Sequence, residues 1–216
     1  MKIAIVGATG FVGAKLLAEA VSRGHHVTAI TRSPQKLPRD PHITAVAADV
    51  NDVPTLIEAF SGQEAVIHSY APARKDSIEA RIAQQRRATT SIIAALRGAG
   101  VRRILAVGGA GTSEIAPGVK LMDSYLFPKA YEGGAKSTAV IKDLLKAEPD
   151  LDWIFLSPPH ALEPGKRTGK YRLGRDNLIF DDATGRSHIS VDDYAVSMID
   201  EMENPRHSRE RFTVGT

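Results

Sequence analysis

Apolar residues along the chain form short runs that alternate with segments of helical periodicity. Runs rich in Ile, Val and Ala predict strands buried on both faces of a sheet. These runs are Ile3–Val6, His26–Ile30, Ile43–Ala47, Ala65–Ser69, Ile104–Val107 and Trp153–Leu156. Apolar residues three and four positions apart predict helices over Ala14–Arg23, Pro54–Phe60, Asp76–Ala99 and Tyr131–Lys146. The alternation predicts an α/β fold with a doubly wound parallel sheet and helices on both faces.

The last part of the chain breaks this alternation. Its strand-like pieces are short and separated by glycines and charged residues, at Tyr171–Leu173, Leu178–Phe180, His188–Ser190 and Phe212–Val214, with a helix predicted over Asp192–Glu203. They predict a small C-terminal extension of one domain covering residues 1–216, since no repeat or linker interrupts the sequence. Residues 108–128 are rich in Gly and Pro and lack periodicity, which predicts a long loop. We expect this loop and residues 158–191 to face the substrate.

Composition narrows the class of protein. The chain has 216 residues, of which 43% are hydrophobic and 25% charged, as in globular proteins. No apolar run approaches the ~20 residues of a membrane span, and the N-terminus reaches a glycine turn too soon for a signal peptide. We therefore expect a cytoplasmic protein with no membrane partner. The net charge of +3 is small and scattered, so no nucleic-acid partner is expected. Cysteine is absent and no cluster of acidic residues and histidines stands out, so no metal site is expected.

A glycine-rich turn, Gly7-Ala8-Thr9-Gly10-Phe11-Val12-Gly13, lies between the first predicted strand and the first predicted helix. In that context the turn predicts a Rossmann-type dinucleotide site. Gly7 permits the tight turn, Gly10 lets the backbone approach a pyrophosphate, and Gly13 lets helix and strand pack closely. The helix N-terminus offers free N–H groups to the phosphates. The alternative is a glycine turn that serves packing alone.

The end of the second strand indicates which dinucleotide binds. NAD-specific sites usually place Asp or Glu there, to accept a hydrogen bond from the ribose 2′-hydroxyl. This chain has Ile30-Thr31-Arg32-Ser33 and no carboxylate. The guanidinium of Arg32 can donate two charge-assisted hydrogen bonds to a 2′-phosphate, and Lys36 can add a second positive charge. We therefore expect NADP(H) to be preferred, with NAD(H) possible. An ordinary surface cation at Arg32 is the alternative.

Several motifs resemble those of extended and atypical short-chain dehydrogenase/reductases, beginning with the G-x-x-G-x-x-G spacing. The resemblance implies that Asp49-Val50 contacts adenine, that Ser69-Tyr70-Ala71-Pro72 passes the cofactor ribose, and that Gly108-Gly109-Ala110-Gly111 lies beside the nicotinamide. The run from Asp152 to Pro158-Pro159 resembles the end of the sixth strand in the NAD(P)H-binding, NmrA-like group. Thr168–Tyr171 and Ile189–Ala195 continue the match. Over nearly the whole chain, the sequence is similar to bacterial NADH-flavin reductases and, more distantly, to biliverdin-IXβ/flavin reductase.

The tyrosine–lysine pair of ordinary short-chain dehydrogenases is not recognisable. Tyr125 and Lys129 have the Tyr-x-x-x-Lys spacing, but Pro128 between them predicts that Tyr125 precedes the helix. Tyr131 and Lys136 are five positions apart, which rotates them off a common helix face. Lys136 is a candidate contact of the cofactor ribose, with a solvated helix lysine as the alternative.

The missing pair favours one class of hydride acceptor. Reducing a simple ketone leaves an alkoxide that needs a proton donor, whereas a flavin or a conjugated tetrapyrrole delocalises the charge. In biliverdin-IXβ/flavin reductase a histidine in the same Pro-Pro-His string borders the substrate pocket. The resemblance implies that His160 binds an anionic acceptor or relays a proton, with a loop histidine bonded only to backbone as the alternative. In the same relative a serine lies near the nicotinamide, after the fifth strand. The resemblance implies that Ala110 takes this position here, and Thr112 and Ser113 are nearby hydroxyl residues that could replace it.

These observations favour a reductase that uses NADPH and a planar, flavin-like small molecule. Two alternatives stay open: an NmrA-like redox sensor that binds NADP(H) without turnover, and an enzyme of the nucleotide-sugar epimerase or dehydratase type. The other histidines, at His25-His26 and His68, are expected to be structural, with His68 a core histidine whose hydrogen bonds are satisfied. The oligomeric state stays open.

Overall fold

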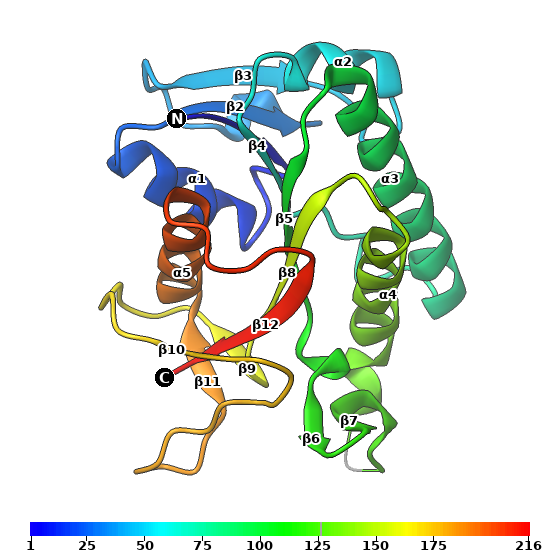
Figure 1. The fold of residues 1–216 in the computed structure, drawn as a ribbon, viewed down its shortest axis with the longest axis vertical. Helices are drawn as coiled ribbons and strands as arrows, with labels where there is room; N and C mark the ends of the chain where they lie inside the picture. The colour runs from blue at the N-terminus through cyan, green and yellow to red at the C-terminus, as the bar shows by residue number, and fades with distance from the viewer. Residues whose placement is uncertain (126) are drawn as a thin grey trace.

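An eight-stranded sheet runs through the centre of the computed structural model, which describes residues 1–125 and 127–216 (Figure 1). The strand order is β10-β12-β8-β5-β4-β1-β2-β3. All neighbouring strands from β12 to β3 pair in parallel, and β10 pairs antiparallel with β12 at one edge. The bounds are β1 Lys2–Val6, β2 His26–Thr31, β3 Ile43–Ala47, β4 Ala65–His68, β5 Arg103–Val107, β8 Asp152–Ser157, β10 Arg172–Gly174 and β12 Glu210–Gly215.

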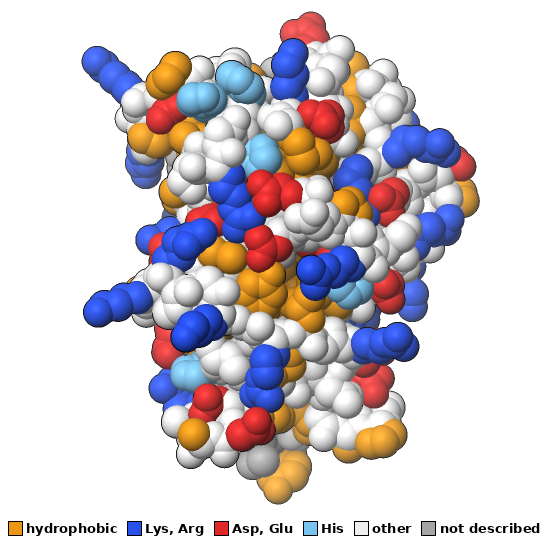
Figure 2. Space-filling view, turned by 60° about the vertical axis from the view of Figure 1, so that its left-hand side comes forward, with side chains coloured by type: hydrophobic (Ala, Val, Ile, Leu, Met, Phe, Trp, Pro, Cys, Tyr) orange, Lys and Arg blue, Asp and Glu red, His pale blue; other side chains and the backbone are white. Residues whose placement is uncertain are grey.

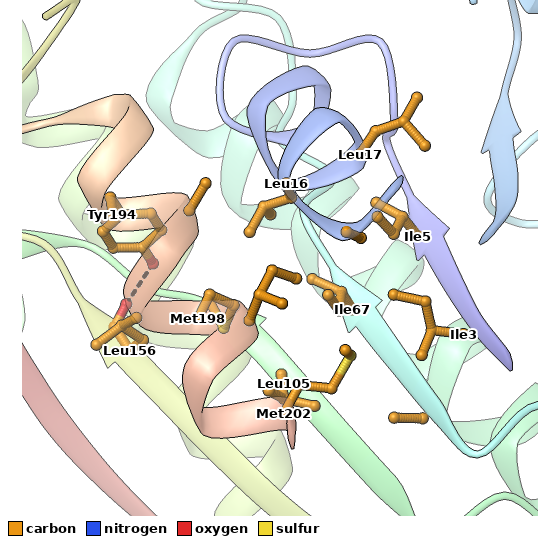
Figure 3. Close-up of a cluster of buried hydrophobic side chains, with 14 of the residues drawn as sticks. Ile3, Ile5, Leu16, Leu17, Ile67, Leu105, Leu156, Tyr194, Met198 and Met202 are labelled. Carbon is orange, nitrogen blue, oxygen red and sulfur yellow. Dashed lines mark hydrogen bonds between the residues drawn. The ribbon is translucent and has the colours of Figure 1, made fainter. Parts of the chain in front are cut away.

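Helices cover both faces of the sheet. On one face lie α1 (Gly13–Ser22) and α5 (Val191–Glu203), and on the other lie α2 (Val53–Phe60), α3 (Ile78–Ala99) and α4 (Lys129–Lys146). Each face buries its own apolar cluster. Figure 3 shows the cluster under α1 and α5, where side chains of β1 and β4 meet those of both helices. The predicted fold class, a Rossmann-type doubly wound sheet, is confirmed.

Capping residues explain where several helices begin and end. The side chains of Asp52, Ser77 and Ser190 accept hydrogen bonds from the backbone N–H groups of the first turns of α2, α3 and α5. Gly100, in the left-handed conformation, ends α3. Helix α1 differs, because Val12 precedes it and gives no side-chain cap. Among the described residues, the N–H groups of Val12 and Gly13 at the start of α1 have no acceptor and are left for another partner.

Two predictions about local structure were wrong. Leu178–Phe180 is not a strand, because Leu178 is buried as a loop anchor whose N–H donates to the carbonyl of Glu114. Residues 108–128 are not a plain loop, since they contain the short strands β6 (Glu114–Ala116) and β7 (Val119–Lys120) and the 3₁₀ turns η2 (Ala110–Thr112) and η3 (Leu121–Asp123).

One further strand was not predicted. β9 (Ala161–Glu163) pairs in parallel with β11 (His188–Ser190), whose bounds the sequence pattern did predict. A third short 3₁₀ turn, η1 (Pro34–Lys36), follows β2. Strands of two or three residues are set by the partner beside them, and local periodicity over so few residues does not distinguish them from loop.

The surface over α1 and α5 carries charges of both signs. Figure 2 shows Lys and Arg side chains interspersed with Asp and Glu on the face it presents. Arg23, for example, forms ion pairs with Glu19, Asp200 and Glu203. Among the described helices, none combines the length and the apolar content needed to cross a bilayer.

Candidate functional site

A cleft of about 960 Å³ lies at the carboxyl ends of β1, β2, β4, β5 and β8. The chain runs from β1 outward to β3 and then returns to β4 on the other side of β1, so the strand order reverses between β1 and β4. Open parallel sheets bind ligands in the crevice formed at such a reversal. The cleft is lined by most of the residues predicted to contact the cofactor: Gly7, Thr9, Gly10, Phe11, Val12, Arg32, Asp49, Val50, Ser69, Tyr70, Ala71, Gly108, Gly109, Pro158 and Pro159.

The glycine turn forms one wall of this cleft. Gly7 adopts a φ of +86°, and a Cβ there would lie 2.8 Å from the carbonyl oxygen of Ser69. A Cβ at Gly13, which does not itself line the cleft, would lie 2.1 Å from the carbonyl oxygen of Gly7. Both positions therefore require glycine, since real Cβ atoms do not approach other atoms so closely.

The last three residues of this turn carry unpaired backbone donors. Within residues 1–125 and 127–216, the N–H groups of Phe11, Val12 and Gly13 have no protein acceptor. Phe11 and Val12 line the cleft. A phosphate would satisfy these donors and benefit from the helix dipole. Assignment of the turn to a pyrophosphate remains a prediction, with this geometry in its favour.

The turn is tied to the end of β2. The Gly7 N–H donates to the carbonyl of Ile30 at 3.0 Å, and the hydroxyls of Thr9 and Thr31 lie 2.8 Å apart. The Thr31 hydroxyl also accepts from the N–H of Ser33 at 3.1 Å. These bonds fix the backbone on either side of Arg32, at the mouth of the cleft.

Arg32 is exposed, and no carboxylate of the described residues lies within ion-pair distance of it. Nearby, hydrogen bonds from the backbone and side chain of Asn51 lower the pKa of Asp49, and the charge of Arg32 lowers it further. Arg32 and Asp49 therefore lie close to each other at one end of the cleft. Arg32 is available for an anionic group, as the predicted contact with a 2′-phosphate requires.

The charges lining the cleft are strongly unequal. Arg32, Lys36, Arg74 and Arg81 are the cations, whereas Asp49 is the single carboxylate among the lining residues that the structure describes. Low-dielectric walls strengthen the field of such a charge set and favour anionic ligands. The cleft therefore suits a dinucleotide with several phosphates.

The opposite wall is held in place by a buried hydrogen bond from α5. The Tyr194 hydroxyl donates to the carbonyl of Leu156 at 2.7 Å (Figure 3), and the Gly108 N–H donates to the same oxygen at 2.8 Å. Burial raises the pKa of the Tyr194 phenol, so it stays protonated and remains a donor. The Gly108 bond joins the end of β5 to β8, and the Tyr194 bond joins α5 to β8, immediately before Pro158 and Pro159, which line the cleft.

A buried carboxylate holds the loop that follows β9. Asp193 accepts hydrogen bonds from the N–H groups of Thr168 and Gly169, both at 2.7 Å, and from the Thr168 hydroxyl at 2.8 Å. Sequence reasoning noted Thr168–Tyr171 and Ile189–Ala195 as motifs but did not foresee that they contact each other. Their shared presence in one family pattern was the only available indication.

The geometry separates the candidate catalytic residues. Helix α4 begins at Lys129 with Pro128 preceding it, so the prediction that Tyr125 lies before the helix is confirmed. Tyr125 is 94% exposed and does not line the cleft. The Lys136 ammonium lies 2.5 Å from the Glu132 carboxylate and Lys136 also lies outside the lining. Nothing in this geometry supports the predicted contact of Lys136 with a ribose.

His160 does line the cleft and is exposed. Its backbone N–H donates to the Ser187 hydroxyl at 3.2 Å, while its imidazole has no partner in the part of the chain that the structure describes. Thr112 and Ser113, the hydroxyl residues that could replace the relative's serine, are both buried and do not line the cleft. The Thr112 hydroxyl donates to a backbone carbonyl, and the Ser113 hydroxyl accepts from Arg211 at 3.0 Å.

His68 lies beneath the cleft on β4 and is fully buried. Its Nε2 lies 3.1 Å from the Thr89 hydroxyl, but its Nδ1 has no partner among the described residues, so the expectation of a fully satisfied core histidine is only half met. Burial lowers the pKa of His68 to about 4 and keeps the ring neutral. His25 is bonded to Glu203 at 2.8 Å, between α1 and α5.

Exposed aromatic side chains were not foreseen as part of the site. Phe11 is 51% exposed and Tyr131 57% exposed, and both line the cleft. Phe127, half-buried, lines it as well. The sequence offered no periodic pattern that would place these three rings together, because they come from the glycine turn and from the start of α4.

Comparison with known proteins agrees with this geometry. The model of the NAD(P)H-binding family matches residues 7–205. The uncharacterized protein YwnB of Bacillus subtilis is 39% identical over 99% of this chain and 98% of its own length. A solved structure from Bacteroides thetaiotaomicron, named a "putative epimerase", is 44% identical with a TM-score of 0.89, and covers 99% of this chain and 96% of its own. A "putative NADH-flavin reductase" from Streptococcus pneumoniae is 30% identical with a TM-score of 0.87, and covers 100% and 99%. The chain therefore belongs to the NAD(P)H-binding family of Rossmann-fold proteins, in the atypical short-chain dehydrogenase/reductase group that its motifs resemble.

Proposed function

We propose that this protein is an NADPH-dependent reductase that transfers hydride to a free flavin or a similar planar conjugated acceptor. The observation that carries the proposal is the pair of exposed aromatic side chains, Phe11 and Tyr131, in the same cleft as the glycine turn. Exposed rings offer flat faces on which a planar acceptor can stack. The likeness to the Streptococcus pneumoniae protein adds support.

The preference for NADPH rests on the charges at the end of β2. Arg32 has no carboxylate partner among the described residues, and Lys36 lines the cleft beside it. An acidic residue that would accept from a ribose 2′-hydroxyl is absent from Ile30-Thr31-Arg32-Ser33. A 2′-phosphate would therefore gain a charge-assisted contact, whereas a 2′-hydroxyl would gain little.

The residues of the cleft divide the work of such a reaction. Bound NADPH supplies the hydride. The N–H groups at the start of α1 and the Arg32 guanidinium hold its phosphates, and the aromatic rings orient the acceptor. The proton that accompanies the hydride comes from solvent or from His160, which lines the cleft and whose imidazole has no protein partner in the described chain.

Chemistry that depends on a Tyr-x-x-x-Lys pair has less support. The residue four positions after Tyr131 is Ala135, and Tyr125 lies outside the cleft. The name of the Bacteroides thetaiotaomicron protein suggests an epimerase, but epimerases of this superfamily resemble the ordinary enzymes in keeping that pair. The nucleotide-sugar epimerase therefore ranks behind the redox sensor as an alternative to the reductase.

Purified protein tests the proposal directly. We expect it to oxidise NADPH when riboflavin phosphate is added, and to do so more efficiently than NADH. NADPH binding without oxidation, in the presence of riboflavin phosphate and of a linear tetrapyrrole, would instead support a redox sensor. Conversion of a nucleotide sugar with no net oxidation of the cofactor would support the epimerase.

A further inference from the structure

Arg81 is a cation in the wall of the cleft without a counter-charge. It lies in the first turn of α3 and lines the cleft. No ion pair or side-chain hydrogen bond links its guanidinium to any other described residue, and its Nε is buried. A partly buried cation with unsatisfied donors is unfavourable unless an anion joins it.

The acids near Arg81, in the chain or on α4, have other partners. Glu79 accepts a hydrogen bond from the Ser77 side chain and interacts with the charge of Lys136. Asp76 accepts from the Gln84 side chain at 3.0 Å, and Glu132 pairs with Lys136 at 2.5 Å. The other carboxylate in the cleft, Asp49, accepts from Asn51. The fold therefore leaves the Arg81 guanidinium unneutralised although carboxylates are available close by in the chain.

Two consecutive glycines of α4 form a niche for this guanidinium. A Cβ at Gly133 would lie 2.6 Å from its Nη1, and a Cβ at Gly134 would lie 3.4 Å from its Nη2. Glycine is unfavourable inside a helix, so a pair of them indicates a packing requirement. The niche holds the planar group against α4, close to the turn that carries Tyr131.

We propose that Arg81 binds an anionic group of the hydride acceptor, a phosphate or a carboxylate. This inference rests on the proposed reductase function and narrows its substrate class to planar conjugated acceptors that carry an anionic side chain. The start of α1 and Arg32 would hold the cofactor's phosphates, whereas Arg81 packs against Gly133 and Gly134, which follow the cleft-lining Tyr131 on α4. The guanidinium fork matches phosphate and carboxylate geometry.

Two pairs of ligands isolate the contribution of the anionic group to binding affinity. Riboflavin phosphate and riboflavin share one ring system and differ by the phosphate, and a linear tetrapyrrole dicarboxylate and its dimethyl ester differ by the carboxylate charges. Equilibrium binding of each is measured on protein saturated with NADP⁺, so that no turnover is needed. We expect the wild type to favour the charged member of at least one pair by on the order of tenfold.

Variants of α3 and α4 assign this selectivity to Arg81. Arg81→Gln should bring the ratio of the two affinities close to one, and Arg81→Lys should retain part of it. Arg86→Gln removes the same charge from an exposed position of α3 outside the cleft, and should leave the ratio unchanged. Gly133→Ala keeps the charge but displaces the guanidinium from its niche, so it should also lower the ratio.

Three results would overturn the inference. The wild type could show no selectivity in either pair, Arg81→Gln could keep the wild-type ratio, or Arg81→Gln could weaken NADP⁺ binding and leave the ratio intact, which would assign Arg81 to the cofactor. Selective binding without NADPH oxidation would refute the proposed function and leave the role of Arg81 standing. Turnover of both flavins, with equal binding of the two members in both ligand pairs, would refute only the role of Arg81.

Discussion

Replacing Arg32 with alanine tests the cofactor assignment. The side chain lies at the end of β2, lines the cleft and has no carboxylate partner among the described residues. Its removal deletes one charge-assisted contact to a 2′-phosphate and leaves the glycine turn untouched. NADH lacks this phosphate, so its affinity should hardly change.

The expected loss follows from the exposure of Arg32. Hydrogen bonds to charged groups contribute about 1.5–3 kcal/mol. Arg32 is exposed and solvent screens such contacts, so the expected loss lies at or slightly below the lower limit of that range. A loss of about 1–1.5 kcal/mol corresponds to a weakening of NADPH binding by roughly five- to thirteen-fold. The difference between wild type and variant should shrink as salt is added, because the interaction lies at the surface.

Fluorescence titration of both cofactors against the wild type, Arg32→Ala and Arg39→Ala measures this directly. Arg39 is exposed and lies outside the cleft, so its replacement controls for a general loss of positive charge. Equal weakening of NADPH and NADH in Arg32→Ala, or the same NADPH loss in Arg39→Ala, would refute the assignment of Arg32 to the 2′-phosphate.

Four further predictions concern the turn, the chemistry, the support of the cleft and the buried histidine. Gly10→Val should abolish NADPH binding, because the new side chain would occupy the place of the pyrophosphate. The variant should still melt cooperatively, because a Cβ at Gly10 meets only the carbonyl oxygen of Gly7 at 3.3 Å. Retained affinity would contradict the pyrophosphate assignment. His160→Ala should lower flavin reduction, by up to ~10²–10⁴-fold if the imidazole delivers the proton, while Tyr125→Phe stays within a few-fold; steady-state rates with the opposite order would indicate a tyrosine-dependent enzyme. Tyr194→Phe should lower the free energy of unfolding in urea by about 1 kcal/mol, because one of two donors to a buried carbonyl is lost; unchanged stability would mean that this bond contributes nothing. Burial lowers the pKa of His68 to about 4 in the folded protein, whereas the pKa of a histidine in the unfolded chain is about 6.5. Between these two values only the unfolded chain binds the proton, so the free energy of unfolding should decrease as the pH is lowered from about 6.5 to about 4. His68→Gln should flatten this dependence in urea titrations at several pH values, and an unchanged slope would contradict the reasoning.

The architecture followed from the sequence because its determinants are local. Apolar runs of four to six residues, separated by amphipathic segments, fixed the central strands and the helices to within one or two residues at most boundaries, as for Ile43–Ala47 and Ala14–Arg23. The glycine spacing located the turn, and the later contacts of Gly7 and Gly13 explain why glycine is required at both positions. Proline at position 128 likewise set the start of α4, since its ring excludes it from a helix interior.

The details of the site required the tertiary structure. The rings of Phe11 and Tyr131 share one cleft only because the sheet brings the first turn of the chain beside α4. Lys136 and Ser113 had suitable chemistry in the sequence, yet nearby partners, Glu132 and Arg211, hold both outside the lining. Pairing of this kind depends on side-chain directions and distances that no spacing rule encodes.

The sequence by itself determined the fold class, the position of the glycine turn and the placement of Tyr125 before α4, because each depends on residues close together in the chain. The tertiary structure decided which charges are paired and which are left free. Arg81 is the clearest case. In the sequence it is one arginine among many, but in the structure it packs against Gly133 and Gly134 and lines the cleft without a counter-charge among the described residues. Electrostatic interactions act through space, so their outcome depends on contacts between residues far apart in the chain.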